Sequence, residues 1–115
     1  MSELNRKLLR DSVAHWEENV ERVKRGDLPD KRFSECALCR EYNWGDRHCE
    51  GCPVYEHTGW IYCRATPFKR VEAWRSLAIV APAFELDAIW ENLLRACEDE
   101  LDFLNKILEE EDTSV

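Results

Sequence analysis

The stretch CALCREYNWGDRHCEGC, residues 36–52, decides how the middle of this 115-residue chain folds. It contains two Cys-x-x-Cys pairs, Cys36 with Cys39 and Cys49 with Cys52, and a fifth cysteine follows at Cys63. Two such pairs supply the four thiolates of a tetrahedral zinc site, with Zn–S distances of about 2.3 Å. Residues 33–65 have no clean helical or strand period. We therefore expect zinc to order this segment, with a contribution on the order of 10 kcal/mol.

Five clustered cysteines compete for four positions around such an ion. The simplest ligand set is Cys36, Cys39, Cys49 and Cys52. Cys63 is the alternative ligand in place of one cysteine of the second pair, and His57 is a weaker candidate, because structural zinc sites use four cysteines or three cysteines with one histidine. The alternative cofactor is an iron–sulfur cluster. Cys52-Pro53 matches the end of a bacterial ferredoxin motif, whereas the rest of that spacing is absent.

The surplus of thiolates argues against catalysis. A catalytic zinc site keeps one coordination position open and usually includes histidine or carboxylate ligands. We therefore predict a structural metal ion, no catalytic residues and no enzymatic activity. The alternative is a thiol redox protein in which Cys49 or Cys63 is a spare reactive thiol. The sixth cysteine, Cys97, fits a buried position on a helix.

Helical periodicity dominates the two ends of the chain. Apolar residues recur at steps of three and four over residues 2–25, with Ser2 as the expected N-cap and Gly26 as the stop. Thr66-Pro67 predicts a second helix start, because a capping hydroxyl precedes a proline. The apolar face expected after this start consists of Phe68, Val71, Trp74, Leu77 and Ala78. Residues 83–110 form the longest expected helix.

The expected fold is therefore a single, mainly α domain over residues 1–115. It comprises an N-terminal helix (1–26), a loop-rich zinc knot (27–65) and a helical C-terminal region (66–111). Three helices form a small bundle, with the knot between the first helix and the second. Pro82 either separates the last two helices or kinks a single one.

The net charge of −8 is concentrated at one end of the chain. Residues 85–115 carry 11 acidic and 2 basic side chains, whereas residues 1–84 are nearly neutral. This balance disfavours binding to nucleic acid, which requires bases against phosphates. No apolar run approaches the roughly 20 residues that span a bilayer, and the N-terminus has no apolar signal segment. We expect a cytoplasmic protein with no membrane partner, in a reducing compartment where cysteines bind metals.

Several side chains outside the metal site are candidates for contacts. Trp44, Trp60 and Tyr55 lie near the cysteines in sequence, where they either shield the metal or anchor a protein partner. His15 and Asn19 share a helix face and either contact a loop or reach a partner. The apolar stripe of the last helix approaches a heptad, so a homodimer through that stripe is a further alternative.

The order of these motifs resembles that of a family. The matching residues are His15-Trp16-Glu17-Glu18-Asn19, Cys36-Ala-Leu-Cys39, Cys49-Glu-Gly-Cys52-Pro53, Thr58-Gly59 and Cys63-Arg-Ala-Thr66-Pro67-Phe68. Over roughly residues 13–70 the chain resembles small, uncharacterised cysteine-rich proteins of tailed phages and prophages. The resemblance implies expression in the cytoplasm of a bacterial host cell and includes Cys63 in the shared pattern. It implies no activity, and the acidic C-terminal helix lies outside it.

The sequence thus predicts a non-enzymatic, zinc-stabilised protein-interaction module, in the phage context a modulator of a host protein. The alternative is a nucleic-acid-binding regulator that uses the zinc knot. Its bases would be Arg40, Arg47, Arg64, Lys69 and Arg70.

Overall fold

The computed structural model describes residues 2–30, 37–42, 51–58 and 66–113. Every secondary-structure element in these ranges is a helix, so the prediction of a mainly α protein is confirmed. The long helices are α1 (Glu3–Lys24), α4 (Phe68–Val80) and α5 (Leu86–Thr113). The short elements are α2 (Ala37–Tyr42), α3 (Pro53–Thr58) and the 3-10 turn η3 (Ala83–Glu85). None of the described helices combines the length and hydropathy needed to cross a bilayer.

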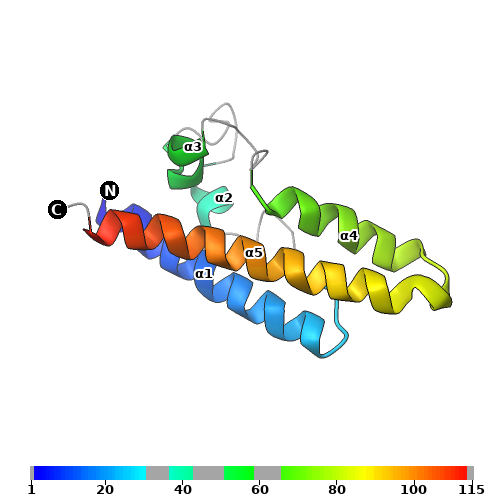
Figure 1. The fold of residues 1–115 in the computed structure, drawn as a ribbon. Coiled ribbons are helices and arrows are strands. Elements are labelled where there is room, and N and C mark those ends of the chain that lie inside the picture. The colour runs from blue at the N-terminus through cyan, green and yellow to red at the C-terminus, as the bar shows by residue number, and fades with distance from the viewer. Residues whose placement is uncertain (1, 31–36, 43–50, 59–65, 114–115) are drawn as a thin grey trace.

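The long helix α5 is the centre of the arrangement (Figure 1). It runs antiparallel to α1 along most of its length and antiparallel to α4 along its N-terminal half. The short helices α2 and α3 lie toward the other end, where α1 begins and α5 finishes. The molecule is elongated, with principal extents of 49 × 31 × 20 Å. The short helices α2 and α3 and the α4–α5 turn therefore lie toward opposite ends.

The predicted limits of α1 are confirmed by its caps. The Ser2 hydroxyl accepts a hydrogen bond from the Asn5 backbone N–H at 3.1 Å, which satisfies a donor of the first turn. At the other end Gly26 has a φ of 87°, and the Asp27 N–H donates to the Arg22 carbonyl at 2.8 Å. This left-handed residue closes the helix as a C-terminal glycine commonly does.

The start of α4 also follows its sequence prediction. The Thr66 hydroxyl accepts from the Phe68 N–H at 3.2 Å, and the Pro67 carbonyl accepts from the Arg70 and Val71 N–H groups. Proline costs nothing at this position because the first helical N–H has no partner within the helix.

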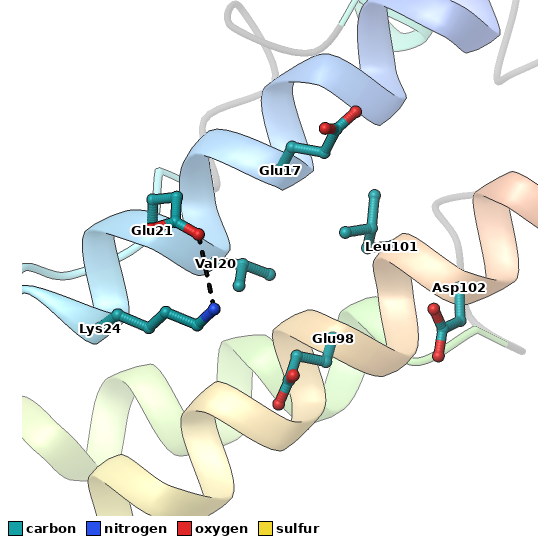
Figure 2. Close-up of a pocket in the computed structure, with 7 residues that line it drawn as sticks. All are labelled: Glu17, Val20, Glu21, Lys24, Glu98, Leu101 and Asp102. Atoms are coloured by element: carbon teal, nitrogen blue, oxygen red, sulfur yellow. Dashed lines mark hydrogen bonds and ion pairs between the residues drawn. The ribbon is translucent and has the colours of Figure 1, made fainter.

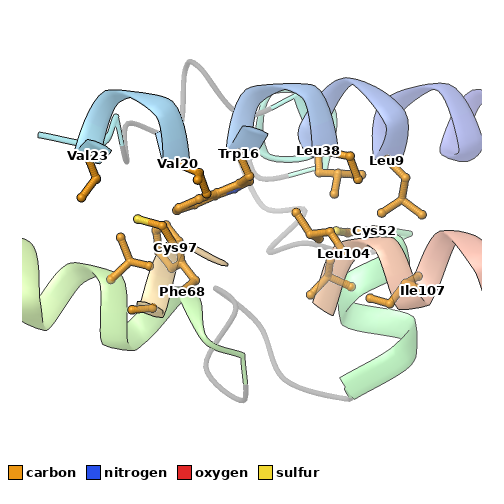
Figure 3. Packing of buried hydrophobic residues seen from close by; sticks show 14 of the residues in the cluster. Leu9, Trp16, Val20, Val23, Leu38, Cys52, Phe68, Cys97, Leu104 and Ile107 are labelled. Atoms are coloured by element: carbon orange, nitrogen blue, oxygen red, sulfur yellow. The ribbon is translucent and has the colours of Figure 1, made fainter. Parts of the chain in front are cut away.

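The core forms along the seam between α1 and α5 (Figure 3). The core residues of α1 are Leu9, Val13, Trp16, Val20 and Val23. The core residues of α5 are Leu93, Ala96, Cys97, Leu104 and Ile107. Phe68 and Val71 add α4 to the core, while Leu38 and Val54 add α2 and α3. Trp16 packs edge to face with Phe68, with ring centroids 6.1 Å apart.

Two expectations about the helices are wrong. The first is the count of three, because α2 and α3 are additional helices within the segment predicted to be a loop-rich knot. The second is the alternative of one helix kinked at Pro82. Ala81 and Pro82 are extended, with ψ of 146° and 154°, and the chain reverses so that α4 and α5 form a hairpin. Proline lacks the N–H that would continue α4.

Candidate functional site

The structure describes only part of the predicted metal site. Cys36, Cys49 and Cys63 lie outside the described residues, as do Trp44 and Trp60. Of Cys39 the backbone is described, in the first turn of α2. The ligand set of Cys36, Cys39, Cys49 and Cys52, with Cys63 as the alternative, therefore stays a prediction.

Cys52 is the one predicted ligand whose side chain is described. It immediately precedes Pro53, the first residue of α3, and its carbonyl accepts from the Glu56 N–H at 2.9 Å. Its side chain is 6% exposed and belongs to the core cluster with Leu38 and Leu104 (Figure 3). This apolar environment is that of a core residue, and the role of Cys52 as a metal ligand stays a prediction.

Asn5 of α1 links the ends of the two cysteine segments. The Tyr42 hydroxyl, three residues after Cys39, donates to Asn5 Oδ1. Asn5 Nδ2 donates to the carbonyl of Gly51, the residue before Cys52, at 3.3 Å. One side chain thus holds α2 and the approach to α3 at the same part of α1. This arrangement suits two Cys-x-x-Cys pairs that bind one ion.

The described side chains alone do not complete a metal site. Within the described ranges, no three His, Cys, Asp or Glu side chains come together as a group that could hold an ion. His57, the weaker ligand candidate, contacts α5 instead. Its Nε2 lies 3.6 Å from a carboxylate oxygen of Glu110, and its ring meets Phe103 edge on. A four-ligand site would therefore need at least two ligands whose side chains lie outside the described part.

Cys97 behaves as the sequence predicts for a core thiol. It is fully buried between α5 and its neighbours, near Val20 and Phe68 in Figure 3. Burial raises the pKa of its thiol to about 12, and the negative charges of Glu100 and Glu98 add to the increase. The group therefore stays protonated at neutral pH, which removes it as a nucleophile.

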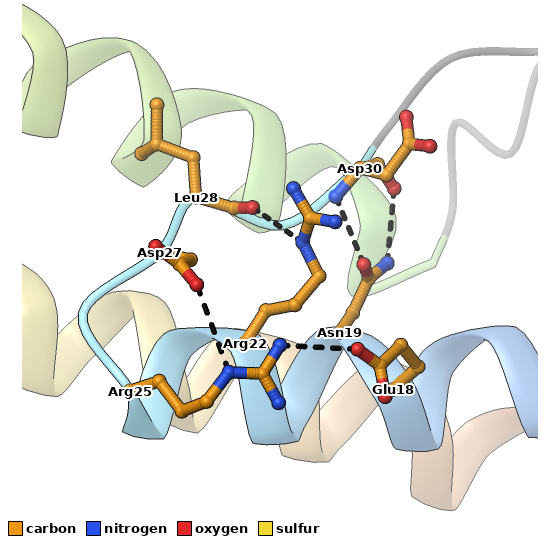
Figure 4. Close-up of polar contacts among 7 residues, drawn as sticks. All are labelled: Glu18, Asn19, Arg22, Arg25, Asp27, Leu28 and Asp30. Carbon is orange, nitrogen blue, oxygen red and sulfur yellow. Dashed lines mark hydrogen bonds and ion pairs between the residues drawn. The ribbon is translucent and has the colours of Figure 1, made fainter.

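His15 and Asn19 contact a loop (Figure 4 shows Asn19). Asn19 is fully buried; its Oδ1 accepts from the Asp30 N–H and its Nδ2 donates to the Asp30 carbonyl, both at 2.9 Å. His15 Nε2 lies 3.2 Å from the same carbonyl. Arg22 of α1 and Arg75 of α4 donate to the Leu28 and Pro29 carbonyls, each at 2.9 Å. The pair therefore has a structural role, which fixes the exit from α1 against α4.

Acidic side chains gather in a groove between α1 and α5 (Figure 2). The groove has a volume of about 370 Å³ and is lined by Glu17, Val20, Glu21, Lys24, Glu98, Leu101 and Asp102. Lys24 lies 3.5 Å from Glu21, and the other acids face solvent. The two helices thus present a solvent-facing acidic surface at this groove.

The bases proposed for nucleic-acid binding are described at two positions, and both make ion pairs within the chain. Lys69 Nζ lies 2.9 Å from Glu72, and Arg70 lies 3.1 Å from Asp99 of α5. Phosphate binding would compete with these carboxylates. The described residues therefore do not favour the nucleic-acid alternative.

The partner-binding prediction rests on three aromatics, of which only Tyr55 is described. Tyr55 of α3 is partly buried and packs against the core. Trp16 is buried, while Trp74 and Trp90 are partly buried against the same core. None of these described aromatics stands out as a projecting anchor.

Apart from Leu4 at the start of α1, the exposed large apolar side chains of the described residues lie instead at the α4–α5 turn, which the sequence analysis missed. We define the apolar tip as Leu77, Ile79, Val80 and Phe84, whose side chains are 45%, 58%, 76% and 85% exposed. Leu77 was expected on the buried face of α4 and lies outside it. A usable signal existed: no charged residue occurs between Arg75 and Glu85, in a chain that is 35% charged.

The apolar tip lies beyond the end of α1. A groove of about 740 Å³ borders it, lined by Val23 and Lys24 at the end of α1 and by residues 87–94 of α5. Past this level the hairpin consists of α4, η3 and α5 without α1 beside them (Figure 1). The uncovered side chains therefore belong to a two-helix projection.

Comparisons of the chain with protein-family models, with curated proteins and with solved structures find no match.

Proposed function

We propose that this protein is a non-enzymatic protein-interaction module that binds its partner through the apolar tip, while zinc stabilises the cysteine-rich end. The observation that carries the proposal is the exposure of Leu77, Ile79, Val80 and Phe84 on a projecting hairpin. Contiguous apolar patches on soluble proteins commonly mark sites of protein–protein contact. The sequence resemblance adds a phage context, in which a host protein is a second candidate for the partner.

The distribution of apolar residues around α4 supports this assignment. Phe68 and Val71 bury one face of the helix against the core, whereas Leu77 and Val80 lie on the opposite side, and Ile79 is exposed near the end of the helix. A helix that is apolar on more than one face is usually covered on more than one face. Burial of each large side chain yields about 1.5–3 kcal/mol, so a partner that covers the tip gains several kcal/mol.

Zinc has a structural role in this proposal. Cys36, Cys39, Cys49 and Cys52 would hold the ion, with Cys63 as the alternative to one of the second pair. The ion would cross-link the segments that carry α2 and α3, which Asn5 already brings to one place on α1. Each of these helices has only six residues, too few to be stable without tertiary or metal contacts.

Site-specific photo-crosslinking tests the interaction surface. A benzophenone side chain replaces Phe84 in one variant and Lys106, an exposed residue near the far end of α5, in the control. On irradiation in a bacterial lysate, we expect one discrete protein adduct from position 84 and none from position 106. The adduct should weaken when Val80→Asp is added. Absence of an adduct at position 84, or an identical pattern at both positions, would contradict the proposed function.

A further inference from the structure

We propose that the occupant of the apolar tip is a second copy of this chain, related by a two-fold axis that places the two α4 helices antiparallel. This inference rests on the proposed function, since it names the partner at the same surface. It concerns a face that no other described element covers.

The outer face of α4 forms a continuous uncharged stripe. Ala73, Ser76, Leu77 and Val80 are all exposed and recur at steps of three and four, so they lie within about 100° around the helix axis. Phe84 of η3, four residues after Val80 in the turn, is also exposed. Two helices pack along such stripes at small crossing angles, as in four-helix bundles.

A two-fold interface requires a surface that is complementary to itself. A charged patch fails this condition because like charges meet, whereas an uncharged apolar patch satisfies it. The segment from Ser76 to Phe84 carries no charge, and its flanks hold bases and acids in equal number: Lys69, Arg70, Arg75, Glu72, Glu85 and Asp87. The tip is therefore the part of the described surface best suited to a second copy.

The charge distribution also excludes the rival place for self-association. The apolar stripe of α5, which approaches a heptad in sequence, is already covered by α1 and α4. The solvent side of that region carries Glu17, Glu21, Glu98 and Asp102. Two copies that met there would bring acids against acids. A dimer through the tip instead directs the acidic C-terminal halves of α5 away from each other.

The available area predicts a weak dimer. Specific interfaces bury about 1,000 Å² or more in total, and the exposed side chains of the tip and the neighbouring stripe are few for an area of that size. We therefore expect a dissociation constant in the micromolar range. Because each chain has a net charge of −8, long-range repulsion opposes the dimer and salt screens it. Dimerisation should strengthen as ionic strength rises, whereas capture of a basic partner by the acidic groove would weaken.

Sedimentation equilibrium of the full-length, metal-loaded protein tests the inference, at concentrations up to about 200 µM and at low and high salt. The test variant is Leu77→Gln and the control is Leu4→Gln. The two leucines are 45% and 49% exposed and lie at opposite ends of the molecule. Glutamine is uncharged, so neither variant introduces a charge that would interact with a helix dipole. It is also a good helix former, so neither substitution should disrupt its helix. Circular dichroism checks that each variant is folded.

We expect a wild-type dimer that tightens with salt. Leu77→Gln should raise the dissociation constant about tenfold or more, because a two-fold interface contains the substitution twice, and Leu4→Gln should leave it unchanged. A wild-type protein that stays monomeric to about 200 µM would overturn the inference, as would a dimer that Leu4→Gln weakens and Leu77→Gln does not. If the protein is monomeric and position 84 still crosslinks to another protein, only the identity of the partner is wrong. If it crosslinks to nothing, the proposed function fails as well.

Discussion

The two ends of this molecule treat their apolar residues in opposite ways. At the cysteine-rich end, Leu38 and Val54 are buried although they come from helices of only six residues, and Cys52, just before α3, is buried with them. At the hairpin end, Leu77, Val80 and Phe84 are exposed although they belong to or adjoin stable long elements. The comparison shows that the length of a helix does not decide whether its apolar side chains are buried. The short helices are held in place by contacts to α1 and, in our proposal, by zinc, whereas the well-formed hairpin leaves apolar area for a partner.

Removal of zinc should have the largest effect, and only at one end. Structural zinc supplies on the order of 10 kcal/mol to segments that cannot fold without it. We predict that a chelator increases hydrogen exchange across residues 37–58 and leaves α4 and the N-terminal half of α5 protected. Hydrogen exchange with mass spectrometry measures both regions in one experiment.

Two buried cysteines provide a test variant and its matched control for this prediction. Cys52→Ser should abolish the bound zinc, whereas Cys97→Ser, a substitution away from the cysteine-rich segments, should retain it at unchanged stoichiometry by metal analysis. Metal-free protein with the exchange pattern of the untreated sample would show that α2 and α3 fold unaided.

Truncation of one buried leucine in the core and one exposed leucine at the apolar tip should sharpen the contrast between buried and exposed apolar residues. Leu93 is fully buried in the core, and Leu93→Ala should cost 2–5 kcal/mol in the free energy of unfolding, an approximate range that includes the cavity. Leu77→Ala, the same change at the apolar tip, should cost under about 0.5 kcal/mol in dilute protein. Urea denaturation gives both values. Equal costs would mean that the tip is packed in the monomer.

Loss of the Asn19 side chain should have an intermediate effect. Asn19 makes two hydrogen bonds to the backbone of Asp30 and is fully buried, so Asn19→Ala should cost about 2 kcal/mol by thermal or urea unfolding. The control is Asn92→Ala, since the Asn92 side chain donates to the Ala88 carbonyl of its own helix at a more exposed site. Both changes gain the same helix propensity, so the difference reports the loop contact. Similar costs for the two would contradict a structural role for Asn19.

The last prediction is a dependence of stability on alkaline pH. The pKa of Cys97 is raised from 9.0 to about 12 in the folded protein, so the folded state retains a proton that the unfolded state releases above pH 9. Stability from this group is therefore complete below pH 9 and falls as the pH rises toward 12. Between pH 9 and 10 wild type should lose about 1 kcal/mol more than Cys97→Ala, which removes only this titration. Identical pH profiles would show that the thiol is not protected.

The parts of the fold that could be predicted are those set by local chemistry. Ser2, Gly26 and Thr66-Pro67 mark helix ends because their caps involve neighbours in sequence. The short helices α2 and α3 could not be predicted, since six residues show no reliable period. Their positions depend on contacts such as that of Asn5 with Tyr42, which are 37 residues apart.

The apolar tip was missed for a geometric reason. Leu77 follows Trp74 at a step of three, which fits a helical stripe, yet at about 100° per residue it lies roughly 120° from Val71 around the axis. Only the packing of α4 on α5 decides which side is buried. In the metal site, the spacing of Cys36, Cys39, Cys49 and Cys52 predicts the donor atoms, and their positions stay a prediction.

Hydroxyl-radical footprinting tests most directly whether the apolar tip is the contact surface. Oxidation of Phe84 and of Leu4, an exposed apolar residue at the other end, is compared between highly diluted pure protein and the crude extract of producing cells. The account predicts that Phe84 becomes protected in the extract while Leu4 is oxidised equally in both. Equal oxidation of Phe84 in both samples would contradict it, since a surface that serves to bind a partner must be covered when that partner is present.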